Sequence, residues 1–143
     1  MKVIMGRRAT GRTERLLVSA AALQLRHDEF VVVFVAPTHR RAHYLSTRVF
    51  ELIEGWQGMT AAPVLDPSRT IVDSAQGLGS RLRGSATVTA LTEHTPGNPS
   101  PSHKVFAFID DADDLGQVAY DQLMDDLTRA GVAVSAVVFT SNV

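Results

Sequence analysis

The chain has 143 residues, of which 45% are hydrophobic and 20% are charged, and its formal net charge is -1. This length and composition predict one soluble globular domain, and the near-zero charge argues against strong nonspecific binding to DNA. The absence of cysteine excludes disulfides and cysteine-ligated metals. No apolar run approaches the roughly 20 residues of a membrane helix and no signal peptide is visible, so we expect a cytoplasmic protein with no membrane partner.

The first half of the chain alternates between apolar strands and amphipathic helices. Residues 2–5 predict a short strand, and residues 13–26 predict a helix with one apolar face. The run FVVVFVA at residues 30–36 is β-branched and continuous, which is typical of a strand buried on both faces of a parallel sheet. A second helix is predicted after this strand, because apolar residues recur there at the spacing of a core-facing stripe. It is expected to end near Trp56.

The second half continues the same alternation. The strands predicted here are residues 69–73, 86–91, 105–109 and 132–140. Residues 116–130 predict a helix, and the Pro- and Gly-rich residues 94–103 predict an exposed loop. Residues 76–84, which contain glycines and arginines, are expected to form a loop near the nucleotide. Together these elements predict an α/β fold with a mainly parallel central sheet, in a single domain over residues 1–143.

A glycine loop, GRRATGRT, joins the first strand to the first helix. It matches the phosphate-binding (Walker A) pattern G-x-x-x-x-G-K-[ST] except at Arg12, where the pattern has lysine. Glycines allow backbone N–H groups to surround a phosphate, the helix N-terminus favours negative charge, and Thr13 is placed to ligate Mg²⁺. The alternative is an ordinary Gly-containing turn. The candidate nucleotide-binding residues are Gly6, Arg7, Arg8, Ala9, Thr10, Gly11, Arg12 and Thr13.

A cluster of aspartates, DDADD, follows the buried strand at residues 105–109 directly. Four apolar residues and then an acid form a Walker B pattern, which delivers a carboxylate to the edge of the sheet beside the glycine loop. We expect Asp110 to hold Mg²⁺ and Asp111 to orient or deprotonate the attacking water. Glu is more usual at the second position and is one methylene longer, so weak or absent hydrolysis is also an expectation. For Asp113 and Asp114 we favour a simple position at a helix N-terminus.

Two polar segments follow other strands. VAPTHRRA, at residues 35–42, supplies the candidate nucleic-acid contacts His39, Arg40 and Arg41, although charged residues on a helix face often interact only with solvent. Thr140, Ser141 and Asn142 follow the last strand, and they are either coupling or sensor residues or simply a polar C-terminus. Both segments are expected at the carboxyl ends of strands, where open α/β sheets bind ligands.

In their order, GRRATGRT, VAPTHRRA, FIDDAD and FTSN resemble the motifs of the ATPase domain of phage large-terminase (DNA packaging) proteins and of the related DExD-type helicases. The resemblance implies a three-layer P-loop NTPase fold of the RecA-like, ASCE type, with Mg-ATP between the loop and the acidic strand end. It implies DNA as a partner and, for a phage-encoded chain, the cytoplasm of the host cell. The residues to which it assigns roles are Gly6, Gly11, Arg12 and Thr13 for the triphosphate, Asp110 for magnesium, and Asp111 with Arg12 for catalysis.

Two substitutions, Arg12 for lysine and Asp111 for glutamate, depart from the family pattern. The sequence also carries neither a nuclease domain nor a second motor lobe, so we expect a homo-oligomer or a subunit of a larger complex. A neighbouring subunit would then supply an arginine finger, with Arg81 or Arg83 as candidates. Three functions stay open: a weak Mg-dependent ATPase, a nucleotide- or nucleic-acid-binding module that does not hydrolyse, and a small-molecule kinase with residues 77–84 as its lid.

Overall fold

The computed structural model describes residues 1–6, 11–26, 30–56, 65, 69–85 and 104–140. Strands and helices alternate along this part of the chain, and none of the described helices is both long and apolar enough to cross a membrane. The elements are β1 (Lys2–Gly6), α1 (Arg12–Arg26), β2 (Phe30–Ala36), α2 (His39–Trp56), β3 (Thr70–Ser74), α3 (Ala75–Ser85), β4 (Lys104–Ile109), the 3₁₀ helix η2 (Ala112–Leu115), α5 (Gln117–Arg129) and β5 (Ala133–Thr140). The strand and loop expected at residues 86–91 and 94–103 lie outside the described residues.

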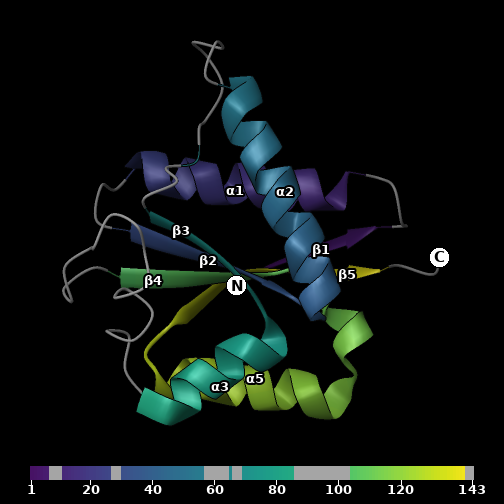
Figure 1. Ribbon diagram of the computed structural model, residues 1–143, viewed down its shortest axis with the longest axis vertical. Coiled ribbons are helices and arrows are strands. Elements are labelled where there is room, and N and C mark those ends of the chain that lie inside the picture. Colours follow the sequence, from purple (N-terminus) through teal and green to yellow (C-terminus); the bar gives the residue numbers. More distant parts are fainter. Residues whose placement is uncertain (7–10, 27–29, 57–64, 66–68, 86–103, 141–143) are drawn as a thin grey trace.

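The described strands form one five-stranded sheet in the order β1-β5-β4-β2-β3, and every neighbouring pair is parallel (Figure 1). This confirms the expected α/β class and parallel sheet. Because all strands run the same way, their carboxyl ends meet at one edge, where the glycine loop and the aspartates both begin. The last strand in sequence, β5, lies between β1 and β4, so it separates the strand before the glycine loop from the strand before the aspartates.

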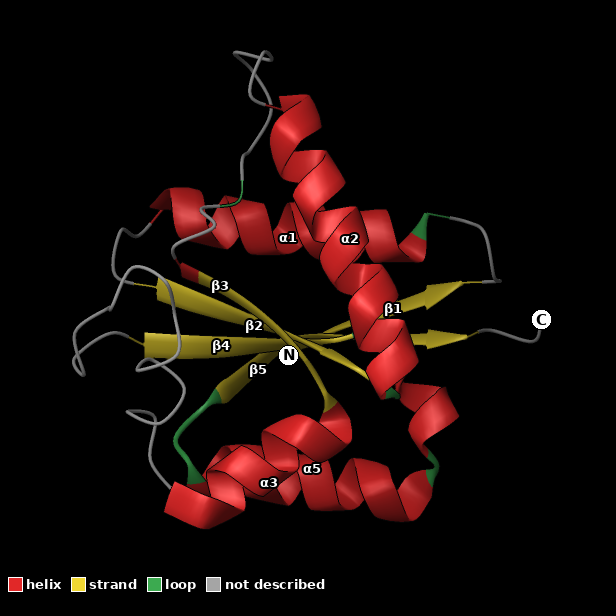
Figure 2. Ribbon diagram, in the orientation of Figure 1, coloured by secondary structure: helices red, strands yellow, loops and turns green. Residues whose placement is uncertain are grey.

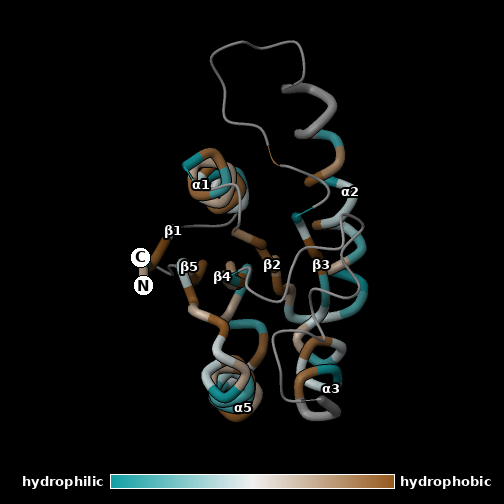
Figure 3. Tube along the Cα trace, turned by 90° about the vertical axis from the view of Figure 1, so that its left-hand side faces the viewer, coloured by the Kyte–Doolittle hydropathy of each residue, from teal (hydrophilic) through white to brown (hydrophobic). Residues whose placement is uncertain are grey.

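The sheet is the middle of three layers, with α1 and α2 on one face and α3 and α5 on the other (Figures 2 and 3). Strand β2 is apolar throughout because both of its faces are covered by helices. Val32 and Phe34 belong to the cluster with α1 and α2, while Val31, Val33 and Val35 belong to the cluster with α3 and α5. All five of these side chains are fully buried. Burial on both faces is therefore what the continuous run indicated.

One expectation for the middle of the chain is wrong: residues 77–84 lie in helix α3 rather than in a loop or lid. Leu78 and Leu82, one helical turn apart, are buried in the core shared with α5. Their burial outweighs the low helix propensity of the glycines in this segment. Arg81, a candidate arginine finger, lies 3.4 Å from the Asp73 carboxylate of its own chain, and the side chain of Arg83 is outside the described part.

Gly77 packs tightly against the end of β3, which gives a first testable prediction. A Cβ at this position would lie 2.6 Å from Oδ1 of Asp73, whose carboxylate is held by the Ser74 N–H at 2.8 Å and by Arg81. Alanine normally stabilises a helix by about 1 kcal/mol relative to glycine. Here we expect Gly77→Ala to lower the free energy of unfolding instead, by about 1 kcal/mol, because the carboxylate must move. Urea denaturation measures the change.

The matched control for this prediction is the same substitution in an Asp73→Ala background. The carboxylate is then gone, and Gly77→Ala is expected to be neutral or stabilising. A Gly77→Ala protein that is more stable than the parent would contradict the tight packing seen here.

Candidate functional site

The N-terminus of helix α1 faces the carboxyl edge of the sheet. Gly11 precedes it with a φ of +77°, a conformation that residues with a Cβ rarely adopt, and its carbonyl accepts the Arg15 N–H at 3.0 Å. The N–H groups in the first turn of a helix have no partner within the helix, so they are available to an anion. Of the candidate loop, residues 7–10 lie outside the described part, and the structure describes Gly6, Gly11, Arg12 and Thr13.

Asp110 lies at the end of β4, where it is almost completely buried. Its N–H donates to the Val35 carbonyl at 2.8 Å, so pairing with β2 continues one residue beyond the strand. The Thr13 hydroxyl donates to Oδ2 of Asp110 at 3.3 Å, across a sequence separation of 97 residues. The fold thus brings together the two side chains that the sequence predicts as magnesium ligands.

Burial, together with the neighbouring charge of Asp111, raises the pKa of the Asp110 carboxyl to about 6. The hydrogen bond from Thr13 acts in the opposite direction. A carboxylate that is buried beside a second carboxylate is costly to ionise unless a cation compensates it. Asp110 is therefore held in a place that favours a positively charged ligand.

Asp111 adopts an unusual backbone conformation, with φ 46° and ψ 50°, in the left-handed region. Among non-glycine residues, Asp and Asn tolerate this region best. The Asp111 carboxylate is buried and contacts two arginines: Arg12 lies 3.4 Å from Oδ1, and Arg41 lies 2.7 Å from Oδ2. Both arginines come from segments that the sequence singled out, but neither contact was predicted.

The start of helix α2 explains how Arg41 reaches Asp111. Thr38 caps the helix, because its hydroxyl oxygen accepts the Arg41 N–H at 3.1 Å and its carbonyl accepts the next N–H at 2.9 Å. The Arg41 guanidinium then bridges Asp111 and Asp114, the latter at 3.1 Å. His39 and Arg40, the other two candidate nucleic-acid contacts, are exposed. Of the three candidate nucleic-acid contacts, Arg41 thus pairs with aspartates of the site, whereas His39 and Arg40 face solvent.

A cavity of about 250 Å³ lies between the N-terminal parts of α1 and α2. Its described lining carries three arginines and two carboxylates, which gives a net positive charge. The lining residues are Gly11, Arg12, Thr13, Glu14, Arg41, Tyr44, Arg48 and Asp111. A concave, positively charged cavity beside a helix N-terminus is suited to an anion that carries phosphate.

Sequence reasoning missed two members of this cavity, Tyr44 and Glu14. A signal was present, because Arg41, Tyr44 and Arg48 recur at the i, i+3, i+7 spacing that places residues on one helix face. Arg48 also joins the two helices: it lies 2.8 Å from Glu14, and this hydrogen bond lowers the pKa of the Glu14 carboxyl. The wall formed by α2 is thereby fixed against the first turn of α1.

The remaining predicted residues lie at the end of β5. Thr140 pairs with Gly6 of β1 in the sheet register, so the end of β5 is adjacent to the start of the glycine loop. The side chain of Thr140, together with Ser141 and Asn142, falls outside the described residues. Within the described ranges there is no cluster of three or more His, Cys, Asp or Glu side chains that could hold a metal on its own.

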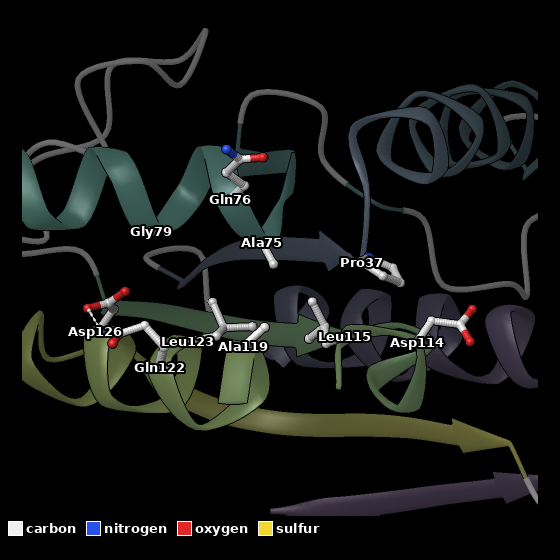
Figure 4. Close-up of a pocket in the computed structure, with 10 residues that line it drawn as sticks. All are labelled: Pro37, Ala75, Gln76, Gly79, Asp114, Leu115, Ala119, Gln122, Leu123 and Asp126. Atoms are coloured by element: carbon white, nitrogen blue, oxygen red, sulfur yellow. Dashed lines mark hydrogen bonds between the residues drawn. The ribbon is translucent and has the colours of Figure 1, made fainter. Parts of the chain in front are cut away.

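A second cavity, of about 280 Å³, lies on the other face of the sheet between α3 and α5 (Figure 4). Asp114 and Asp126 lie at its opposite ends. The Asp126 carboxylate is buried and accepts hydrogen bonds from Gln122 at 3.0 Å and Arg129 at 2.8 Å, while Asp114 pairs with Arg41. Both acids are thus neutralised within the chain, and we assign no ligand to this cavity.

Comparison with known proteins adds no relative to this picture. No protein-family model, no curated protein and no solved structure matches the chain. Function must therefore be inferred from the arrangement of Thr13, Asp110, Asp111 and the arginines around them.

Proposed function

We propose that this protein binds a nucleoside triphosphate, with ATP as the expected nucleotide, together with Mg²⁺ in the cavity between α1 and α2. The observation that carries the proposal is the 3.3 Å contact between Thr13, at the N-terminus of α1, and Asp110, at the end of β4. A hydroxyl in the first turn after a glycine loop and an acid at a strand end are the two groups that a P-loop site needs side by side.

The strand order supports the same proposal. An additional strand between the glycine-loop strand and the acidic strand is the feature for which ASCE-type P-loop proteins are named, and β5 occupies that place. The three layers and the parallel sheet are compatible with a RecA-like domain. A relationship to phage packaging ATPases or DExD-type helicases, with DNA as a partner, remains part of the proposal.

The residues present fit a magnesium ion that is shared with phosphate. Mg²⁺ in nucleotide sites keeps several waters and needs only one or two protein ligands besides the phosphates, so the lack of a three-acid cluster among the described residues is no obstacle. The Thr13 hydroxyl and the buried Asp110 carboxylate supply these oxygens. The ion, when bound, would neutralise charge on the phosphates.

Each neighbouring group then has a separate role. The N–H groups at the N-terminus of α1 and the Arg12 guanidinium hold phosphate oxygens. Asp111 is the carboxylate that would orient the attacking water. Tyr44, which is 65% exposed, lines the same cavity further along α2, where the rest of the nucleotide would leave it.

A nucleotide-binding module that does not hydrolyse is the second candidate, and one observation favours it. Both oxygens of Asp111 contact arginines, so in this state the carboxylate is not free to orient water. On this alternative, Arg12 and Arg41 hold Asp111 permanently. The exposed His39 and Arg40 would then contribute to a nucleic-acid surface on the same protein.

The Asp111→Asn variant separates these candidates. Asparagine tolerates the left-handed backbone and keeps the size of the side chain, so the fold is retained while the charge is lost. If the protein is an ATPase, phosphate release from Mg-ATP is expected to fall roughly 100-fold or more, with nucleotide binding maintained. Phosphate release is measured with and without DNA. Measurable binding with no turnover in the wild type supports the module, and the absence of nucleotide binding rejects both candidates.

A further inference from the structure

The two arginines on Asp111 hold opposite sides of its carboxylate. Arg12 belongs to α1 and contacts Oδ1, whereas Arg41 belongs to α2 and contacts Oδ2. Asp111 therefore lies between the two guanidinium groups. Arg12 belongs to the first turn of α1, and Arg41 lies on the other side of the Asp111 carboxylate. A phosphate at the first turn of α1 would lie beside Arg12, and a further phosphate in the same cavity would lie beside Arg41.

Arg41 is also built to exchange partners. Its guanidinium is forked, with one nitrogen on Asp111 and the other on Asp114, and its side chain is 40% exposed where it lines the cavity. Arginine binds phosphate through the same paired geometry that it uses for carboxylates. A terminal phosphate, with a charge of about -2 and three oxygens, competes well with a single carboxylate. Arg41 could turn to it and keep its contact with Asp114.

We propose that Arg41 distinguishes a nucleoside triphosphate from the corresponding diphosphate. It leaves Oδ2 of Asp111 for the terminal phosphate, and this oxygen is released only when that phosphate is present. This inference rests on the proposed function, because it assigns a further role within the same nucleotide site. Arg41 is then a specificity-determining residue, while Arg12 serves the phosphates that both nucleotides share.

The test compares the affinities of ADP and of a non-hydrolysable ATP analogue, both with Mg²⁺, by isothermal titration calorimetry. In Arg41→Ala we expect the affinity for the ATP analogue to fall about 10-fold, while the affinity for ADP changes by less than about twofold. The preference for the triphosphate is therefore largely lost. Arg41→Lys keeps the charge without the fork and is expected to recover part of this preference.

Arg48→Ala is the matched control, because Arg48 lines the same cavity with the same charge but contacts Glu14 and Glu51 instead of Asp111. It is expected to weaken both nucleotides by the same factor and to leave their ratio unchanged. Circular dichroism confirms that each variant is folded, and Arg41→Lys carries the test if Arg41→Ala is not.

The outcomes distinguish this inference from the function on which it rests. If the wild type binds neither nucleotide, the proposed function fails. If the wild type binds both nucleotides equally, or if Arg41→Ala weakens both by the same factor, nucleotide binding stands and the role of Arg41 is rejected.

Discussion

Asp110→Asn is expected to stabilise the protein at pH 7.5 and, at the same time, to remove its magnesium-dependent nucleotide binding. Burial raises the pKa of Asp110 to about 6, so ionising this carboxyl at neutral pH costs the folded state roughly 3 kcal/mol. Asparagine removes the charge, and its amide can still face the Thr13 hydroxyl and the Asp111 N–H, which contact Asp110 at 3.3 and 3.1 Å. Thermal denaturation without magnesium measures the gain, and calorimetry with Mg-ATP measures the loss of binding.

The pH dependence gives the control for this prediction. The pKa of Asp110 is higher in the folded protein than the ordinary value of 3.8, so the folded state binds the proton more tightly. Stability from this group is complete below pH 4 and is lost as pH rises through about 6. The advantage of Asp110→Asn over the wild type should therefore shrink as the pH is lowered from 7.5 to 4. An advantage that is constant over this range would show that the charge of Asp110 is not its cause.

Arg12→Ala is expected to weaken ATP and ADP alike, by roughly 10- to 100-fold, because it removes a charge-assisted contact to phosphates that both nucleotides carry. This result differs from that expected for Arg41→Ala, which affects the triphosphate only. Fluorescence titration with labelled ATP and ADP measures both affinities. Stability should change little, since Asp111 keeps its shorter contact, at 2.7 Å, to Arg41.

Arg12→Lys is the matched variant, since it restores the residue of the phosphate-binding pattern and keeps the charge. We expect its affinities to lie within about 10-fold of the wild type, because the point charge remains while the fork is lost. An Arg12→Ala protein that binds both nucleotides as tightly as the wild type would mean that the cavity does not hold phosphate beside α1.

The strands and most helices follow from the sequence because their signals are local. The run FVVVFVA predicts β2, and the spacing of Leu123 and Leu127 predicts the buried face of α5. Helix α3 was missed because Gly77 and Gly79 suggest a loop, although Leu78 and Leu82 have the spacing of one helix face. Burial of these leucines in the core stabilises α3, and helix propensity alone does not predict that burial.

The candidate site could be predicted only in part, for a different reason. The sequence predicts that Thr13 and Asp110 share a magnesium site, because the Walker A and Walker B patterns occur together in nucleotide-binding proteins. The contacts of Arg12 and Arg41 with Asp111 span 99 and 70 residues, and they depend on the strand order and on the cap that Thr38 gives to α2. Contacts of this kind cannot be predicted from a residue pattern or from a count of charges.

The left-handed backbone at Asp111 also limits the evolutionary routes that are open to this site. A glutamate at this position would lengthen the carboxylate arm by one methylene, but it would carry a conformational cost of about 1 kcal/mol that Asp and Asn largely avoid. A lineage that gained the longer acid would carry this cost unless the turn between β4 and η2 changed as well. The shape of one residue's backbone thus makes Asp111 a stable endpoint, from which Asn and Gly are more accessible neighbours than Glu.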